Sequence, residues 1–317
     1  MHTTKVLGAA VVLLTASGAL AQVNRDINSY VLFALTDLSF KGRDADATRG
    51  FIIGGNVGVN RIDPTPNDSN HQLRMGGGGS AHPVVMSPGT QVVSDSMGLG
   101  GSDVTVWDMY ANVWGNTNLQ ANRNSGPTAF TPTIVALLPS LGFTPNRALT
   151  NGAADFNVPE NTTATLAPGS VRRDVTVRDG ATLNLGAGVY DLRNLRCGTD
   201  VTINVTDQTI LRIDGEFSMN NDGFFGVGTQ GLAQVFCGSY QVGSNDATIH
   251  FSRRTEAHGW FYAPNGILNL GNHTDLFGRF WADQIGSDWN VNVTYTPTPG
   301  ALGLVALGGM VAGRRRR

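Results

Sequence analysis

Short alternating apolar segments separated by turn residues dominate the hydrophobic pattern of the 317-residue chain. The pattern repeats most closely within residues 250–295, where residues 259–263 (GWFYA) recur as residues 278–282 (GRFWA). Each copy leads into a turn and then into a short alternating segment, residues 267–270 or 291–293. Such a segment buries one face only, so neighbouring copies have to stack. The interval of about 20 residues is typical of one coil of a β-solenoid.

A four-residue pattern extends this architecture to distant parts of the chain. Residues 103–106, 174–177 and 200–203 each place an aspartate at a turn before an apolar-Thr-apolar strand. In stacked coils the apolar side chains of such strands point inward and the Thr side chains point outward. Asp-Gly pairs at 179–180 and 214–215 supply tight turns. The sequence therefore predicts an all-β, β-solenoid-like fold with short coils.

The period fails between residues 114 and 159, where one helical segment is expected. Residues 131–139 read TPTIVALLP, in which Thr131 can cap, Pro132 suits the first turn and Pro139 ends the apolar run. A helix inserted into a solenoid covers an open end or a core face and so prevents edge-to-edge pairing. A partner-binding role is the alternative for this helix.

Composition agrees with a β-rich chain, with 41 Gly and 15% charged residues. Residues 1–21 are typical of an export signal, because Lys5 precedes an apolar run and Ala21 closes a small-x-small cleavage site. We expect one β-solenoid-like domain over residues 22–295. Without Lys5 and the four terminal arginines the formal charge of −2 becomes about −7. An acidic body argues against a nucleic-acid partner.

The two cysteines, Cys197 and Cys237, leave two alternatives open. Their separation is close to two coils, which would place them too far apart for a disulfide. If the glycine-rich part between them is one long coil, they lie side by side, and an exported protein can keep such a bond.

Four segments resemble a known family: residues 50–56 (GFIIGGN), 188–192 (GVYDL), 210–217 (ILRIDGEF) and 259–265 (GWFYAPN), the last with its second copy at 278–282. They are similar to the choice-of-anchor A type of bacterial surface protein, over most of the mature chain. The resemblance implies a secreted, surface-displayed, adhesin-like β-solenoid domain. It supplies no catalytic residues.

Residues 296–317 resemble the PEP-CTERM sorting tail of Gram-negative bacteria, although Thr298 stands where that motif carries Glu. The apolar stretch 301–313 is shorter than the ~20 residues that span a bilayer, and terminal arginines would hold the end on the cytoplasmic side. The resemblance implies a transient anchor whose partners are the export machinery and a tail-processing membrane protease. The motif consists of Pro297, Pro299, Gly300, Arg314, Arg315, Arg316 and Arg317.

Aromatic residues are the candidate ligand-binding groups. Trp260, Tyr262, Trp281 and Trp289 would form a sugar-stacking strip if exposed on one face, or would fill the interior of the coils. The strip would fit an extracellular polysaccharide; the interior location, which we favour for some of them, would make these residues structural.

Catalytic and metal sites have weaker support in the sequence. Asp275, Asp283 and Asp288 with Arg279 would line the groove of a polysaccharide lyase or hydrolase, but acids beside turns are typically solvated strand ends. Three histidines could be metal ligands, but no carboxylate or cysteine lies at a diagnostic interval from them. We therefore expect them to be ordinary surface histidines. These histidines are His250, His258 and His273.

The sequence thus favours an exported, non-catalytic, structural or adhesive protein of the cell surface or extracellular matrix. It predicts no cofactor and no metal. The alternative is a β-helix protein that binds or degrades extracellular polysaccharide.

Overall fold

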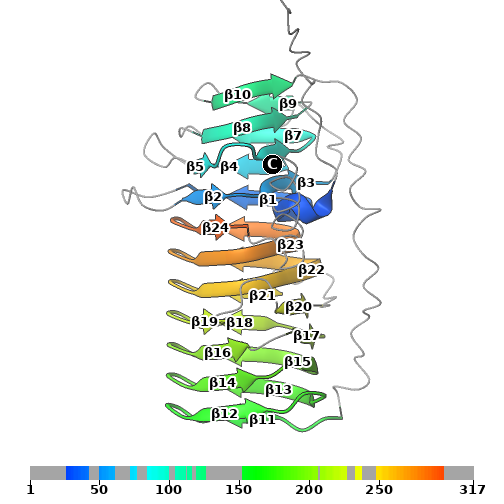
Figure 1. Ribbon diagram of the computed structural model, residues 1–317, viewed down its shortest axis with the longest axis vertical. Coiled ribbons are helices and arrows are strands. Elements are labelled where there is room, and N and C mark those ends of the chain that lie inside the picture. Colours follow the sequence, from blue (N-terminus) through cyan, green and yellow to red (C-terminus); the bar gives the residue numbers. More distant parts are fainter. Residues whose placement is uncertain are drawn as a thin grey trace, which may run out of the picture.

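The computed structural model describes residues 26–42, 50–60, 72–76, 84–99, 104–111, 113–115, 119–125, 152–205, 208–226, 233–237 and 248–295. These residues form 24 strands of one sheet, stacked in parallel as a β-solenoid (Figure 1). The only helical segment among them is a 3-10 turn, η1 (Ile27–Ser29). No helix in these ranges has the length and apolar character needed to cross a membrane. The predicted fold class is confirmed.

Ten strands belong to the N-terminal half of the described chain. They are β1 (Tyr30–Phe40), β2 (Phe51–Ile53), β3 (Asn56–Val59), β4 (Leu73–Met75), β5 (Val84–Met86), β6 (Gln91–Val93), β7 (Ser96–Leu99), β8 (Val104–Tyr110), β9 (Val113–Gly115) and β10 (Leu119–Ser125).

The remaining strands belong to the C-terminal half. They are β11 (Phe156–Val158), β12 (Thr163–Leu166), β13 (Val171–Val177), β14 (Thr182–Leu185), β15 (Gly188–Cys197), β16 (Thr202–Val205), β17 (Thr209–Ile213), β18 (Phe217–Met219), β19 (Phe224–Phe225), β20 (Gln234–Cys237), β21 (Ile249–Phe251), β22 (Glu256–Leu270), β23 (Asp275–Ser287) and β24 (Asn292–Thr294).

The coils wind around three faces, and the longest strands bend from one face to the next. The first face stacks β13, β15, β17, β20, β22, β23, β1, β3, β6, β8 and β10. The second stacks β11, β13, β15, β18, β21, β22, β23, β1, β4, β7 and β9. The third stacks β12, β14, β16, β19, β22, β23, β24, β2, β5, β8 and β10.

The order of the stack differs from the order of the chain. The C-terminal half climbs from β11 and β12 at one end to β23 and β24 at the middle, and the N-terminal half continues from there with β1 and β2 (Figure 1). β1 pairs with β23, and β2 pairs with β24. We call this junction the seam. The first and last described segments of the chain therefore meet halfway along the stack.

The repeat that the sequence predicts is confirmed at the level of register. Residues 259–263 of β22 lie directly beside residues 278–282 of β23, one residue against one. The alternating segments that follow correspond differently from the prediction, because residues 267–270 pair with residues 284–287. Residues 291–293 instead lie one face further along, where Val293 pairs with Leu276.

Inward-pointing side chains from all three faces form one continuous core. The apolar-Thr-apolar pattern is confirmed, since Val175 and Val177 are buried while Thr176 between them is partly exposed. In the middle coils the core is aromatic, and Phe261 stacks on Phe280 with ring centroids 5.2 Å apart. Aromatic rings packed in this way contribute more than their buried area alone.

A left-handed residue marks the corner between the second and third faces in each coil of the C-terminal half. Its backbone N–H donates to a carbonyl oxygen in the next coil, from Asn161 to Asp179 at the lower end up to Asn290, which reaches Gly42 across the seam. Gly, Asn and Asp tolerate this conformation best. The corner residues are Asn161, Gly180, Asp200, Asp222, Arg254, His273 and Asn290.

Three predictions fall outside the described residues. They are the export signal at 1–21 with its cleavage site after Ala21, the inserted helix at 131–139, and the sorting tail at 296–317 with its motif residues.

Candidate functional site

Three of the four candidate aromatic residues lie together on the outer side of the first face. Trp260 and Tyr262 belong to β22, and Trp281 belongs to β23 directly beside Tyr262. The Trp281 ring contacts the Trp260 ring edge-on at 5.0 Å and the Tyr262 ring at 6.3 Å. Because side chains alternate along a strand, Phe261 and Ala263 occupy the interior instead. Of these three aromatic residues only Trp281 is buried, as expected for some of them, but it lies outside the coil in a cluster separate from the main core.

The N-terminal segment covers part of this aromatic layer. Ile27 of η1, with Tyr30 and Phe33 of β1, packs against Trp281 in a small cluster separate from the main core. Trp281 is 1% exposed and donates its indole N–H to the carbonyl oxygen of Tyr30 at 3.1 Å. It is therefore structural and inaccessible to a ligand. Trp260 and Tyr262 keep partly exposed rings, and burial raises the pKa of Tyr262.

Arg279 lies next to these rings, in register with Trp260. It is 6% exposed. Its guanidinium donates to the side-chain oxygen of Asn28 at 2.9 Å and to the Tyr295 hydroxyl at 3.2 Å. The guanidinium carbon lies 5.9 Å from the Trp260 ring centroid and 5.5 Å from that of Tyr295. The Tyr295 hydroxyl in turn donates to the Asn28 carbonyl oxygen at 2.8 Å, so this arginine joins both described termini to β23.

Trp289 does not belong to the aromatic cluster. It lies at the corner between the second and third faces, where the ammonium group of Lys41 is 5.7 Å from its ring. Lys41 also pairs with Asp288 at 2.9 Å. The four predicted aromatic residues therefore do not make one strip.

The carboxylates of the predicted groove are distributed around one coil. Asp275 begins β23 on the third face, where it accepts a hydrogen bond from Asn292 at 2.8 Å. Asp283 follows Ala282 where β23 bends from the first face to the second, and Asp288 follows the end of β23. Arg279 lies on the first face, separate from all three. The structure does not gather a lyase or hydrolase constellation from these residues.

The three histidines also lie apart. His250 is on the second face beside Ser252, and His273 occupies the left-handed corner. His258 is on the third face, with its ring 2.6 Å from the Glu256 carboxylate and stacked on Phe277 at 4.5 Å. Within the described ranges there is no group of three or more His, Cys, Asp or Glu side chains arranged to hold a metal ion.

Cys197 and Cys237 are free, buried thiols. Of the two alternatives, the one in which they form a disulfide is therefore wrong. Cys197 lies on the second face, below Met219, and Cys237 lies on the first face, above Ile213. The coils are unequal in length, since Val177 and Cys197 are partners 20 residues apart but Met219 and Phe251 are partners 32 residues apart. Burial raises both thiol pKa values well above the usual range, which makes these cysteines poor nucleophiles.

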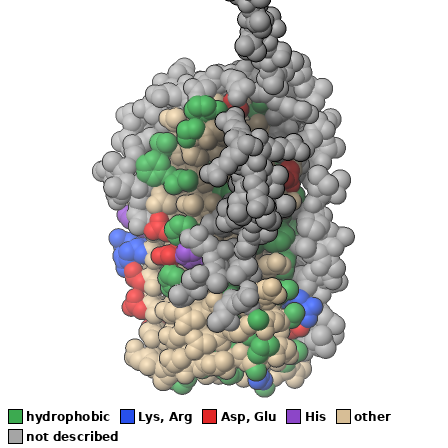
Figure 2. Space-filling view, in the orientation of Figure 1, with side chains coloured by type: hydrophobic (Ala, Val, Ile, Leu, Met, Phe, Trp, Pro, Cys, Tyr) green, Lys and Arg blue, Asp and Glu red, His purple; other side chains and the backbone are tan. Residues whose placement is uncertain are grey.

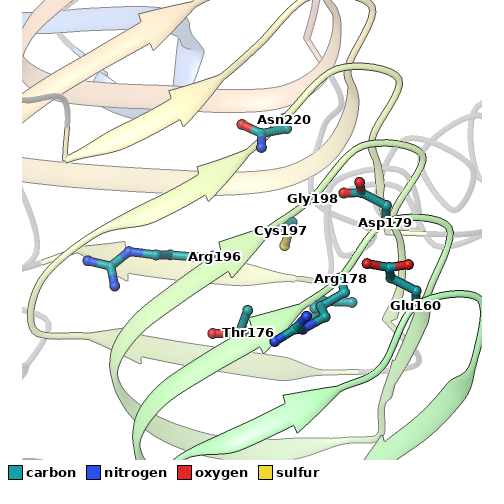
Figure 3. A pocket seen from close by; sticks show the side chains of 9 residues that line it. Glu160, Thr176, Arg178, Asp179, Arg196, Cys197, Gly198 and Asn220 are labelled. Carbon is teal, nitrogen blue, oxygen red and sulfur yellow. The ribbon is translucent and has the colours of Figure 1, made fainter.

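A cavity of about 330 Å³ opens at the corner between the second and third faces (Figure 3). Glu160 and Asp179 lie on one side of it and Arg196 on the other (Figure 3). The Asp179 carboxylate accepts the backbone N–H of Thr199 at 2.8 Å, so it takes part in the corner itself. These charged residues do not form an acid and base pair of the kind that a catalytic site needs. We therefore assign no chemistry to the cavity.

Outward charges elsewhere in the lower coils pair between neighbouring coils. Arg173 contacts Asp155 at 2.6 Å, and Arg193 contacts Asp174 at 2.6 Å. Arg212 pairs with Asp191 in the same way. Figure 2 shows basic and acidic side chains side by side on the described surface. Such pairs place opposite charges next to each other on neighbouring coils.

Sequence reasoning missed Asn28 and Tyr295, which complete the surroundings of Arg279. Asn28 and Arg279 are 251 residues apart, and no local pattern relates them. Tyr295 ends the last predicted strand region and gave no separate signal.

No family model matches the chain. No curated protein matches it either. Among solved structures, the chain is similar to the crystal structure of an ice binding protein from an Antarctic bacterium, Flavobacteriaceae. The identity is 11% and the TM-score 0.15, over 84% of this chain and 82% of that one. A likeness this low carries no argument about function.

Proposed function

We propose that the chain is an exported, non-catalytic protein of the cell surface or extracellular matrix, with a structural or adhesive role. The supporting feature is the solenoid itself, in which each inner coil is hydrogen bonded to a neighbour on both sides over three faces. Such a stack is stiff and presents long side-chain rows at regular spacing. Rows of this kind suit the display of a surface better than the enclosure of a substrate.

The position of the seam carries the proposal. Residues 26 and 295 bound the described chain, and Tyr295 contacts Asn28 at mid-stack. The described chain therefore begins and ends at mid-stack rather than at an end of the solenoid. If residues 296–317 act as a transient anchor, the body is attached near the middle of the stack.

A polysaccharide-degrading role is the weaker alternative, because Asp275, Asp283 and Asp288 are separated around the coil. Polysaccharide binding has specific support, since Trp260 and Tyr262 keep partly exposed rings beside Arg279. Partly exposed aromatic rings can pack against the apolar side of a sugar.

The experiment compares the full chain with a variant that lacks residues 296–317, both expressed with the export signal in a Gram-negative host. We expect the full chain in the membrane fraction and the variant released as soluble protein with the same far-UV β signal. A variant that lacks only the four terminal arginines is the control for charge. Aggregation of the truncated protein, or its retention with the membrane, would count against a separable anchor.

A further inference from the structure

Arg279 is a buried cation whose described partners are all neutral. Its two hydrogen bonds go to an amide oxygen and a phenol, and its two ring contacts are with Trp260 and Tyr295. The carboxylate of Asp26 reaches it only indirectly, by accepting from the Asn28 amide at 3.0 Å. A buried charge without an opposite charge in contact is costly, and in proteins it usually has an ionic partner.

Two buried donors at this place have no acceptor among the described residues. They are the Nε–H of Arg279 and the indole Nε1–H of Trp260. The two residues are direct partners on neighbouring strands of the first face, and we call the region around them the spot. Buried donors are almost always paired, and each unpaired donor destabilises the protein. The spot therefore lacks an acceptor, and one that carries negative charge would satisfy both requirements.

The walls of the spot indicate what kind of molecule brings that acceptor. Trp260 and Tyr295 are partly exposed, and Asn28 at the rim is exposed. A guanidinium pairs best with the two oxygens of a carboxylate, and an indole face packs against the flat apolar side of a sugar ring. A sugar that carries a carboxylate, a uronic acid residue, fits both groups at once.

We propose that Arg279 and Trp260 form a binding site for uronic acid residues of an acidic polysaccharide, with Asn28 and Tyr295 holding the guanidinium in place. This site rests on the proposed function and gives it a ligand class. The acidic body does not oppose binding at short range, because surface charges more than about 8 Å away are screened at physiological salt. A uronate chain with spaced carboxylates would run along the first face at the seam.

The test measures thermal unfolding and calorimetric binding of the purified protein with oligogalacturonate and with its neutral methyl ester. Oligomers of glucuronate and mannuronate are tested in the same way. We expect at least one charged oligomer to raise the Tm by about 2–8 °C at saturation, because a ligand that binds only the folded state stabilises it. The matching ester should have no effect, since it keeps the sugar backbone and removes the charge.

Arg279→Met should weaken binding by about 30-fold or more, since it removes one member of a buried charge pair. Without ligand its Tm should be unchanged or raised, because an apolar side chain replaces an unpaired buried charge. Arg279→Lys keeps the charge without the planar group and should bind with intermediate strength. Arg196→Met is the matched control, since Arg196 is exposed on the second face and pairs with Glu216. It should bind like the parent protein.

Three outcomes would overturn the site. One is the absence of a Tm shift with all charged oligomers, and another is a shift that persists in Arg279→Met. The third is a loss of binding in the control Arg196→Met as large as that in Arg279→Met, which would show that the effect does not come from the spot. None of these results bears on export or anchoring, so failure of the site and failure of the proposed function are separable.

Discussion

The first face carries two different outer layers along one row of aligned positions. In the lower coils the row contains Asp191 and Arg212, which form an ion pair between coils. Towards the seam the same row continues with Tyr262, Trp281 and Phe33. The backbone register is equivalent in both regions, and the inward neighbours are apolar in both. The two regions therefore have the same backbone arrangement, and the difference between their outward side chains has to come from what covers them.

The difference follows from the cover that the N-terminal segment provides. η1 and the beginning of β1 lie over the aromatic part of the row, where Ile27 and Tyr30 contact Trp281. Water reaches the lower part of the row, so charged side chains are retained there and pair with one another. The seam thus has a second apolar layer outside the coil, while the lower coils depend on the interior core and on ion pairs.

The largest expected effect is at the seam. Trp281→Ala should lower the free energy of unfolding by about 3–5 kcal/mol, because it empties a buried space and removes the hydrogen bond to Tyr30. Urea denaturation measures the change. It is followed by far-UV circular dichroism because the substitution removes a tryptophan and so alters the fluorescence. Arg212→Ala is the matched control, since it alters the same row in the lower coils and removes a partly exposed ion pair worth about 0.2–1 kcal/mol. Equal losses in the two variants would show that the outer aromatic layer contributes nothing special.

A smaller effect is expected at the glycines that let β22 and β23 approach. Gly278 has φ +140°, and a methyl group there would overlap the backbone carbonyl oxygen of Gly259. Gly278→Ala should destabilise the protein by about 1–3 kcal/mol from the backbone conformation alone, with the overlap adding to it. Thermal unfolding checks this.

Gly286→Ala in the same strand is the control for Gly278→Ala. Its added methyl group would meet only the side chain of Asn269, at 3.2 Å. If both alanine variants melt at the same temperature, close approach between β22 and β23 is not what selects Gly278.

The repeat and its register were predictable because they are local properties. Residues 259–263 and 278–282 share glycine, aromatic and alanine positions at one interval, and alternation decides which side chains oppose each other. Alternation does not tell which side chains point inward when both sides of a strand are apolar. This is the case in β22, where Phe261 and Tyr262 are both large. The side on which each aromatic residue lies therefore could not be assigned from the sequence.

The seam and the surroundings of Arg279 were not predictable from one sequence. Any coil of a solenoid offers the next one a similar edge, so the pattern does not say that β1 stacks on β23 rather than on β24 or β10. The cysteine alternatives had the same origin, because a coil of 32 residues between Met219 and Phe251 moves Cys237 to another face. Local alternation survives such insertions, whereas long-range positions depend on the length of each loop.

The smallest expected effect concerns the ion pairs of the C-terminal half. Hydrogen bonds from Arg254 lower the pKa of Asp222, and those from Arg173 lower the pKa of Asp155. A carboxylate whose pKa is lower in the folded state binds fewer protons there than in the unfolded chain near pH 4. Its stabilising contribution is therefore complete above the unfolded pKa of about 3.9 and is lost as the pH falls through the lower folded value.

Asp222→Asn should accordingly flatten the decline of Tm between pH 6 and pH 3 relative to the parent protein, with Asp155→Asn adding to the effect. Both carboxylates are at the surface, so the change should be small and should shrink further in 1 M salt, which screens exposed pairs. Trp281→Ala should shift the whole Tm profile downward without changing this slope, because no titrating group is removed. If the Tm of the double Asn variant still falls steeply, the acid sensitivity of the fold comes from other carboxylates and not from these two ion pairs.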